Sequence, residues 1–227
     1  MKVHLKNRLR SAIQNLINKI SAMRKFFLYL IWMVAANLAN GQSLTKGNYS
    51  LLTAQLDSIY TKDQKYRQMT DSVKAKHGLE SKEIKDLWKT INKNDSANLV
   101  QVTNILETYG WLGADAVGEQ GNATIFLVIQ HADQKTQEKY LPMMRQAVKN
   151  GKAKGSQLAL LEDRVAMRQG KKQIYGSQIS RDPKTGKYFV APIEDEPNVN
   201  KRRAAVGLMP LEDYARHFNI EYKLPEK

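Results

Sequence analysis

The segment Ala123–Asp133, with the sequence ATIFLVIQHAD, decides the fold class of this chain. At about 100° per residue, the apolar run 125–129 covers the whole circumference of a helix. A helix that is apolar on all sides is a buried one. A buried strand is the alternative for so short a run, but Asn122 before it is a good helix cap and a helical pattern follows. We therefore predict a buried central helix that starts at Asn122.

Before this helix, apolar residues recur at helical spacing. A thin stripe predicts a long surface helix from Ser43 to about Lys76, broken near His77-Gly78. A second helix is predicted from Ser81 to about Ile91. The pair Asp95-Ser96 is predicted to stop it and to cap a third helix, which ends at Gly110.

After the central helix, the pattern predicts two more helices, Thr136–Asn150 and Ser156–Gln169. Pro142 should kink the first or delay its start, and Ser156 should cap the second. The period then changes to that of strands. Two extended runs joined by a D-P-x-x-G turn predict a β-hairpin, and they span Gln173–Ser180 and Lys187–Ile193. Short helices are predicted around Lys201–Val206 and over Leu211–Phe218. The predicted class is mainly α (α+β), a helical domain with a buried central helix and one C-terminal β-hairpin.

The N-terminal region has the three parts of an export signal. Arg24 and Lys25 precede the uncharged apolar run Phe26–Ala36, and Ala39-Asn40-Gly41 places small residues at a cleavage site. The run is shorter than the about 20 residues that a membrane-spanning helix needs. We predict a signal peptide over 23–41 and an exported protein, periplasmic or extracellular, with no stable transmembrane span after cleavage. An uncleaved anchor is the alternative.

Residues 1–22 have a basic amphipathic pattern. They are interpreted either as a cytosolic extension or as residues that are never made, because translation can start at Met23. The predicted organisation is then an accessory helical region over 42–110 and a main helical domain with the hairpin over 111–227.

The formal net charge of +14 is partly a property of the leader. Residues 1–41 hold seven of the 36 lysines and arginines and none of the 22 acids, so the remainder has 29 basic residues against 22 acidic ones, a net charge of +7. The remaining positive charge lies on helix faces that also carry acidic residues. These faces lack the interleaved basic and aromatic residues on which nucleic-acid bases stack. We expect no nucleic-acid partner.

The chain has no cysteine. Disulfides, thiol catalysis and cysteine-ligated metals are therefore excluded. It also has no phosphate-binding loop, dinucleotide glycine motif, H-E-x-x-H or nucleophile elbow. We expect no cofactor and assign no metal ligands, although His131 with Asp133 and Asp163 would have suitable chemistry.

The polar end of the central helix is the best candidate site. Gln130, His131 and Asp133 follow the buried run, where polar groups need partners. The candidate catalytic residues are His131 as general acid or base, with Asp163 or Asp133 to orient it. The candidate substrate contacts are polar residues at this helix end, in the 156–169 helix and in the segments after it: Gln130, Arg164, Gln173, Tyr175, Gln178 and Arg202. For each set, a satisfied structural network is the alternative.

Several short motifs resemble those of a bacterial family of unknown function, DUF6624. They are Val117-Gly118-Glu119, Gln130-His131-Ala132-Asp133, Asp163-Arg164-Val165, Gln173-x-Tyr175-Gly176-Ser177-Gln178 and a tail motif over 198–208. The resemblance covers about Leu112 to Phe218. It implies that the helices before Trp111 are accessory, and it implies no reaction.

Two hypotheses of function follow. The first is an exported enzyme, hydrolase-like or lyase-like, that acts on a polar small molecule or envelope component through His131. The second is a non-catalytic envelope module that binds a ligand or a partner, in which the same residues hold the fold together. A minor third is a basic surface that binds an anionic polymer.

Overall fold

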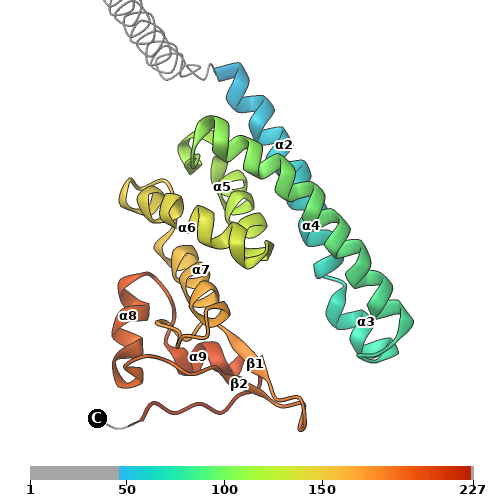
Figure 1. The fold of residues 1–227 in the computed structure, drawn as a ribbon, viewed down its shortest axis with the longest axis vertical. Coiled ribbons are helices and arrows are strands. Elements are labelled where there is room, and N and C mark those ends of the chain that lie inside the picture. Colours follow the sequence, from blue (N-terminus) through green and yellow to red (C-terminus); the bar gives the residue numbers. More distant parts are fainter. Residues whose placement is uncertain (1–45, 226–227) are drawn as a thin grey trace, which may run out of the picture. The chain divides into compact units, whose positions relative to one another are not determined.

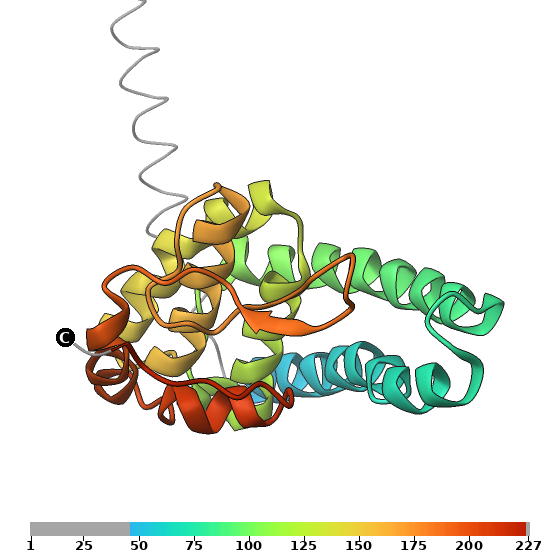
Figure 2. The same cartoon turned by 90° about the horizontal axis from the view of Figure 1, so that it is seen from below.

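The first half of the domain is built from long helices. The computed structural model describes residues 46–225, so the predicted extension 1–22 and signal peptide 23–41 lie outside the described residues. Helix α2 spans Lys46–Arg67, α3 spans Thr70–His77 and α4 spans Lys82–Tyr109. Figures 1 and 2 both show α2 and α3 alongside α4. Side-chain hydrogen bonds join Gln55 to Gln101 and Arg67 to Asp95. Because the later residue of α2 pairs with the earlier residue of α4, the two helices are antiparallel.

The predicted break at Asp95-Ser96 is wrong, because α4 continues through both residues. The Asp95 carboxylate binds Arg67 instead of a helix end, and the Ser96 hydroxyl donates to the carbonyl of Asn92, one turn earlier in the same helix. The N-cap of α4 is Ser81, whose Oγ accepts from the Ile84 N–H at 3.2 Å. The Asp95-Ser96 pair has the residue types of a helix cap, but both side chains bind other partners.

The predicted central helix is confirmed as α5, Ala114–His131, with a non-helical residue at Gly118 (φ 72°). Ile125, Phe126, Val128 and Ile129 are buried, as the pattern predicted. The proposed cap was wrong. Asn122 lies inside the helix, and its side-chain amide donates to the carbonyls of Leu112 and Lys152 at 2.7 Å each.

Helix α6, Gln134–Lys149, starts before the predicted Thr136, because Asp133 is its N-cap and accepts from the Thr136 N–H at 2.7 Å. It continues through Pro142. Helix α7 spans Gly155–Arg168, and its N-cap position is Lys154, so Ser156 is not the cap. Helix α5 contacts α4, α6 and α7, and thus forms the centre of the described fold (Figure 1).

The C-terminal part contains the predicted hairpin. Strands β1 (Ile179–Arg181) and β2 (Tyr188–Val190) pair antiparallel, with Ser180 opposite Phe189. The ladder is shorter than predicted, because the backbone N–H groups before β1 bind side chains instead of a neighbouring strand. A short 3₁₀ turn (Glu196–Asn198), α8 (Val199–Ala205) and α9 (Leu211–Arg216) complete the fold. None of the helices in residues 46–225 has the length and apolar character of a membrane span.

Candidate functional site

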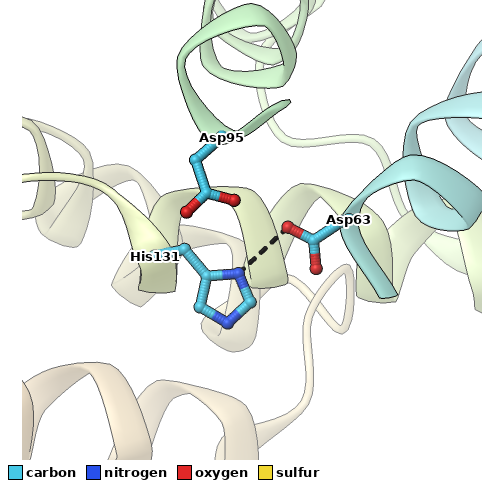
Figure 3. Close-up of side chains that lie close together, drawn as sticks. All are labelled: Asp63, Asp95 and His131. Atoms are coloured by element: carbon cyan, nitrogen blue, oxygen red, sulfur yellow. Dashed lines mark hydrogen bonds and ion pairs between the residues drawn. The ribbon is translucent and has the colours of Figure 1, made fainter. Parts of the chain in front are cut away.

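His131 is the last residue of α5, and its ring contacts a carboxylate from α2. The Nδ1 atom lies 3.0 Å from Oδ1 of Asp63. The Asp63 side chain is 1% exposed and the His131 side chain 18% exposed. Figure 3 shows that the second ring nitrogen, Nε2, points away from both nearby carboxylates, those of Asp63 and Asp95. The pair is therefore a buried carboxylate that holds a partly accessible imidazole.

Arg67 and Gln64 complete the surroundings of Asp63. The Gln64 amide donates to Asp63 Oδ2 at 2.7 Å, and Arg67 Nε lies 3.5 Å from the same oxygen. Arg67 also binds both carboxylate oxygens of Asp95, at 2.5 and 2.6 Å. Burial alone would raise the pKa of Asp63. The hydrogen bond and charge of His131, with Arg67 and Gln64, outweigh burial and lower this pKa below its ordinary value.

A cavity of about 250 Å³ opens beside this pair. Its walls come from α4, the end of α5 and the start of α6: Asn92, Asp95, Ser96, Leu99, Val128, His131, Ala132 and Asp133. Pockets that enclose drug-sized ligands measure about 300–1,000 Å³. This cavity therefore suits a small polar molecule or one group of a larger one.

Three groups here could contact a cation. Ligand atoms of Asp63, Asp95 and His131 all lie within 4.8 Å of one another. However, Arg67 already bonds to Asp95 and pairs with Asp63. A divalent ion would have to displace this guanidinium or share the carboxylates with it. The described arrangement is therefore better suited to proton transfer than to metal binding.

The predicted catalytic residues His131, Asp133 and Asp163 have different surroundings in the structure. His131 and Asp133 both line the cavity, but the exposed Asp133 carboxylate caps α6. The hydrogen bond from Thr136 N–H is the main reason why the pKa of Asp133 is lowered. Asp163 is fully buried on α7, and its carboxylate accepts from the N–H groups of Ile174, Tyr175 and Ser177. The carboxylate that contacts His131 is thus Asp63, and neither Asp133 nor Asp163 has the expected orienting role in the structure.

Most of the predicted substrate contacts belong to one hydrogen-bonded network around residues 173–178. Gln173 is buried, donates to the carbonyls of Gln178 and Ala191, and accepts from the Gln178 N–H. Tyr175 accepts from Arg203 through its carbonyl. Arg202 donates to the carbonyls of Ile174, Glu194 and Asp195. The side chains of Gln173, Arg202 and Arg203 therefore hold the loop in place.

Two predicted contacts connect this network to the end of α5. Arg164 donates from Nε to Gln178 Oε1 at 3.1 Å and from Nη1 to the Gln130 carbonyl at 3.3 Å. Gln130 itself is buried, and its carbonyl also accepts from Gln137 at 2.8 Å. Arg164 therefore lies next to the peptide that leads into His131.

Sequence reasoning missed Asp63, Asp95 and Arg67. One signal was present for Asp63. The buried stripe of α2 contains Leu52, Leu56 and Ile59, and the next position at this spacing is Asp63. A carboxylate inside an apolar stripe needs a partner in the fold.

The fold and this site define a mainly helical domain with a histidine–aspartate pair at the end of its central helix. The chain belongs to DUF6624, a family of unknown function, whose model matches residues 50–227. The match extends beyond the 112–218 segment that carries the resemblance and includes nearly all of α2 and all of α3 and α4. No curated protein and no solved structure matches the chain.

Proposed function

We propose that this protein is an exported enzyme, hydrolase-like or lyase-like, in which His131 is the general acid or base and Asp63 orients it. One observation carries the proposal: His131 Nδ1 lies 3.0 Å from the buried Asp63 carboxylate, while the ring borders an open cavity. A carboxylate bound to one ring nitrogen fixes the orientation and tautomer of imidazole. The other nitrogen is then available to exchange a proton with substrate.

The alternative is a histidine with a purely structural role. A fully buried structural histidine has its ring nitrogens bonded inside the protein, whereas the His131 side chain is 18% exposed. Among residues 46–225, the hydrogen bond of the His131 side chain is the one to Asp63. Nε2 points away from Asp63 and Asp95 (Figure 3). This geometry favours a reacting group over a structural one.

The proposal can be tested with a panel of chromogenic esters, phosphate esters and glycosides, together with polar envelope fragments. Wild type is compared with His131→Gln and Asp63→Asn, and His217→Gln is the matched control because His217 is exposed beyond α9. Loss of a general acid or base lowers kcat by about 100-fold or more. We expect this loss in His131→Gln, a smaller one in Asp63→Asn and none in the control. An activity that His131→Gln retains in full would eliminate this role for His131. Absence of activity in wild type across the panel would make the non-catalytic binding module the better hypothesis.

Export is a separate part of the proposal and is supported by the 23–41 sequence pattern. N-terminal sequencing of the protein from its native host tests it. A mature chain that starts at Gln42 is expected. A chain that retains Met1 or Met23 would contradict cleavage and favour the uncleaved anchor.

A further inference from the structure

Two arginines of α7 flank the end of α5 that carries His131. Arg164 and Arg168 are one helical turn apart. Nη1 of Arg164 donates to the carbonyl of Gln130 at 3.3 Å, and Nη1 of Arg168 donates to the carbonyl of Ala132 at 2.8 Å. These carbonyls belong to the residues immediately before and after His131. Both guanidinium groups therefore lie close to the backbone of the proposed acid–base residue.

Neither arginine forms an ion pair with a carboxylate of residues 46–225, because their hydrogen-bond acceptors are neutral oxygens. The Asp133 carboxylate is influenced by the charge of Arg168, but it is bonded to the start of α6. Arg164 is partly buried. A cation that has lost part of its hydration and has no anionic partner is costly.

The positive charges around Arg164 increase this cost. Burial is the largest cause of the lowered pKa of Arg164, followed by the charge of Arg168. The charge of Arg67, which binds Asp95 beside His131, also lowers this pKa. Arg164 and the His131–Asp63 pair thus belong to one electrostatic environment. An incoming anion would relieve the repulsion between these arginines.

The hydrogen-bonding capacity of Arg164 is also incompletely used. A guanidinium group has five N–H donors in a planar fork. Among residues 46–225, Arg164 has two acceptors, Gln178 Oε1 and the Gln130 carbonyl. The remaining donors can bind two oxygens of a carboxylate or phosphate group.

We infer that Arg164, together with Arg168, binds an anionic group of the substrate, a carboxylate or a phosphate, next to His131. This inference rests on the proposed function and specifies its substrate class. The competing explanation is that both arginines only anchor the last carbonyls of α5. An anchor does not require anion binding, so measured binding separates the two explanations.

The experiment uses the full chain with potassium phosphate and potassium acetate as probes. Binding is measured by calorimetry and by the shift in Tm, at an ionic strength matched with potassium chloride. We compare wild type, Arg164→Gln and Arg168→Gln, with Arg145→Gln as the matched control because Arg145 is exposed and pairs with Glu162. Because hydrogen bonds to charged groups are strong, we expect Arg164→Gln to weaken binding about tenfold or more. Arg168→Gln should weaken it less, and the control should bind like wild type.

The outcomes are distinct. Binding of phosphate alone assigns a phosphorylated substrate, and binding of acetate alone assigns a carboxylate. Failure of wild type to bind either anion, or equal binding by wild type and Arg164→Gln, overturns the inference. If Arg164→Gln does not fold, Arg168→Gln and Arg164→Lys provide the same comparison.

His131→Gln distinguishes this inference from the proposed function. It should still bind the anion, because the arginines remain. Anion binding without any His131-dependent activity would contradict the enzyme and leave the anion site intact. His131-dependent activity without anion binding would support the enzyme and contradict the anion site.

Discussion

Asp163 is a buried carboxylate whose partners are all backbone groups. Its side chain is 0% exposed, and it accepts N–H bonds from Ile174 at 2.6 Å, Ser177 at 2.9 Å and Tyr175 at 3.0 Å. These bonds satisfy the charge and leave the loop at 173–178 with a fixed conformation. The burial of Asp163 is therefore explained by its structural role in holding this loop.

This explanation predicts a large loss of stability in Asp163→Asn. The amide places N–H donors where the carboxylate accepted, so backbone donors lose their partner inside the protein. We expect the free energy of unfolding to fall by about 3 kcal/mol or more, as measured by urea denaturation. Asp133→Asn, at an exposed cap, is the comparison and should cost about 1 kcal/mol or less. An Asp163→Asn protein as stable as wild type but inactive would instead return Asp163 to the catalytic set.

Asp63 differs from Asp163 in that its partners are side chains, and its stability contribution depends on pH. Its folded-state pKa is lowered from the ordinary 3.8, so the ionised carboxylate stabilises the fold above that pH. This stabilisation is lost as the pH falls through the lowered folded-state value. Protonated aspartic acid and asparagine have nearly the same shape.

We therefore expect wild type to be more stable than Asp63→Asn near neutral pH, and this difference to shrink on acidification below 3.8. Urea denaturation of both proteins over a series of pH values measures the difference. Other carboxylates titrate in both proteins and cancel in the subtraction. A difference that stays constant or grows in acid would contradict the stabilisation of ionised Asp63 by its contacts with His131, Arg67 and Gln64.

At the scale of helices and strands, local spacing predicted most of the secondary structure, including α5, α6, α7 and the hairpin turn. Two of the errors occurred where a polar side chain had a distant partner. Asp95 resembled a cap but binds Arg67, 28 residues earlier. Asn122 resembled a cap but binds Lys152, 30 residues later. Sequence spacing contains no information about such partners, so a cap and a tether have the same local pattern.

Two serines, one at the N-cap of α4 and one inside the helix, test this distinction directly. Ser81 accepts from the Ile84 N–H and caps the helix, whereas the exposed Ser96 donates to the preceding turn within it. We expect Ser81→Ala to cost about 1 kcal/mol of unfolding free energy and Ser96→Ala less than about 0.5 kcal/mol. Thermal denaturation of both variants measures this. A larger loss for Ser96→Ala would support the helix break that the sequence pattern first suggested.

At the scale of the whole molecule, the site depends on α2 and α4. The sequence pattern predicts that both belong to an accessory region outside the main domain. His131 and Asp133 were predictable because they follow a buried run. Asp63 was not paired with His131, because 68 residues separate them and only the packing of α2 on α5 brings them together. Leu56 packs so closely over Gly121 that a Cβ there would lie 3.3 Å from Leu56 Cδ1. The accessory region therefore supplies part of the core and part of the site.

This dependence predicts that a chain of residues 111–227 does not fold like residues 42–227. Without α2 and α4, the truncated chain loses the Asp63 bond to His131 and uncovers the part of α5 that faces them, where Leu56 lies over Gly121 and the buried Val128 lies beside Leu99. Exposed apolar patches of this kind cause association. We expect residues 42–227 to show one cooperative thermal transition as a defined species in size-exclusion chromatography, and residues 111–227 to lose that transition and associate. If residues 111–227 instead unfold cooperatively as a monomer, the earlier helices are a separable accessory, and His131 must work without Asp63.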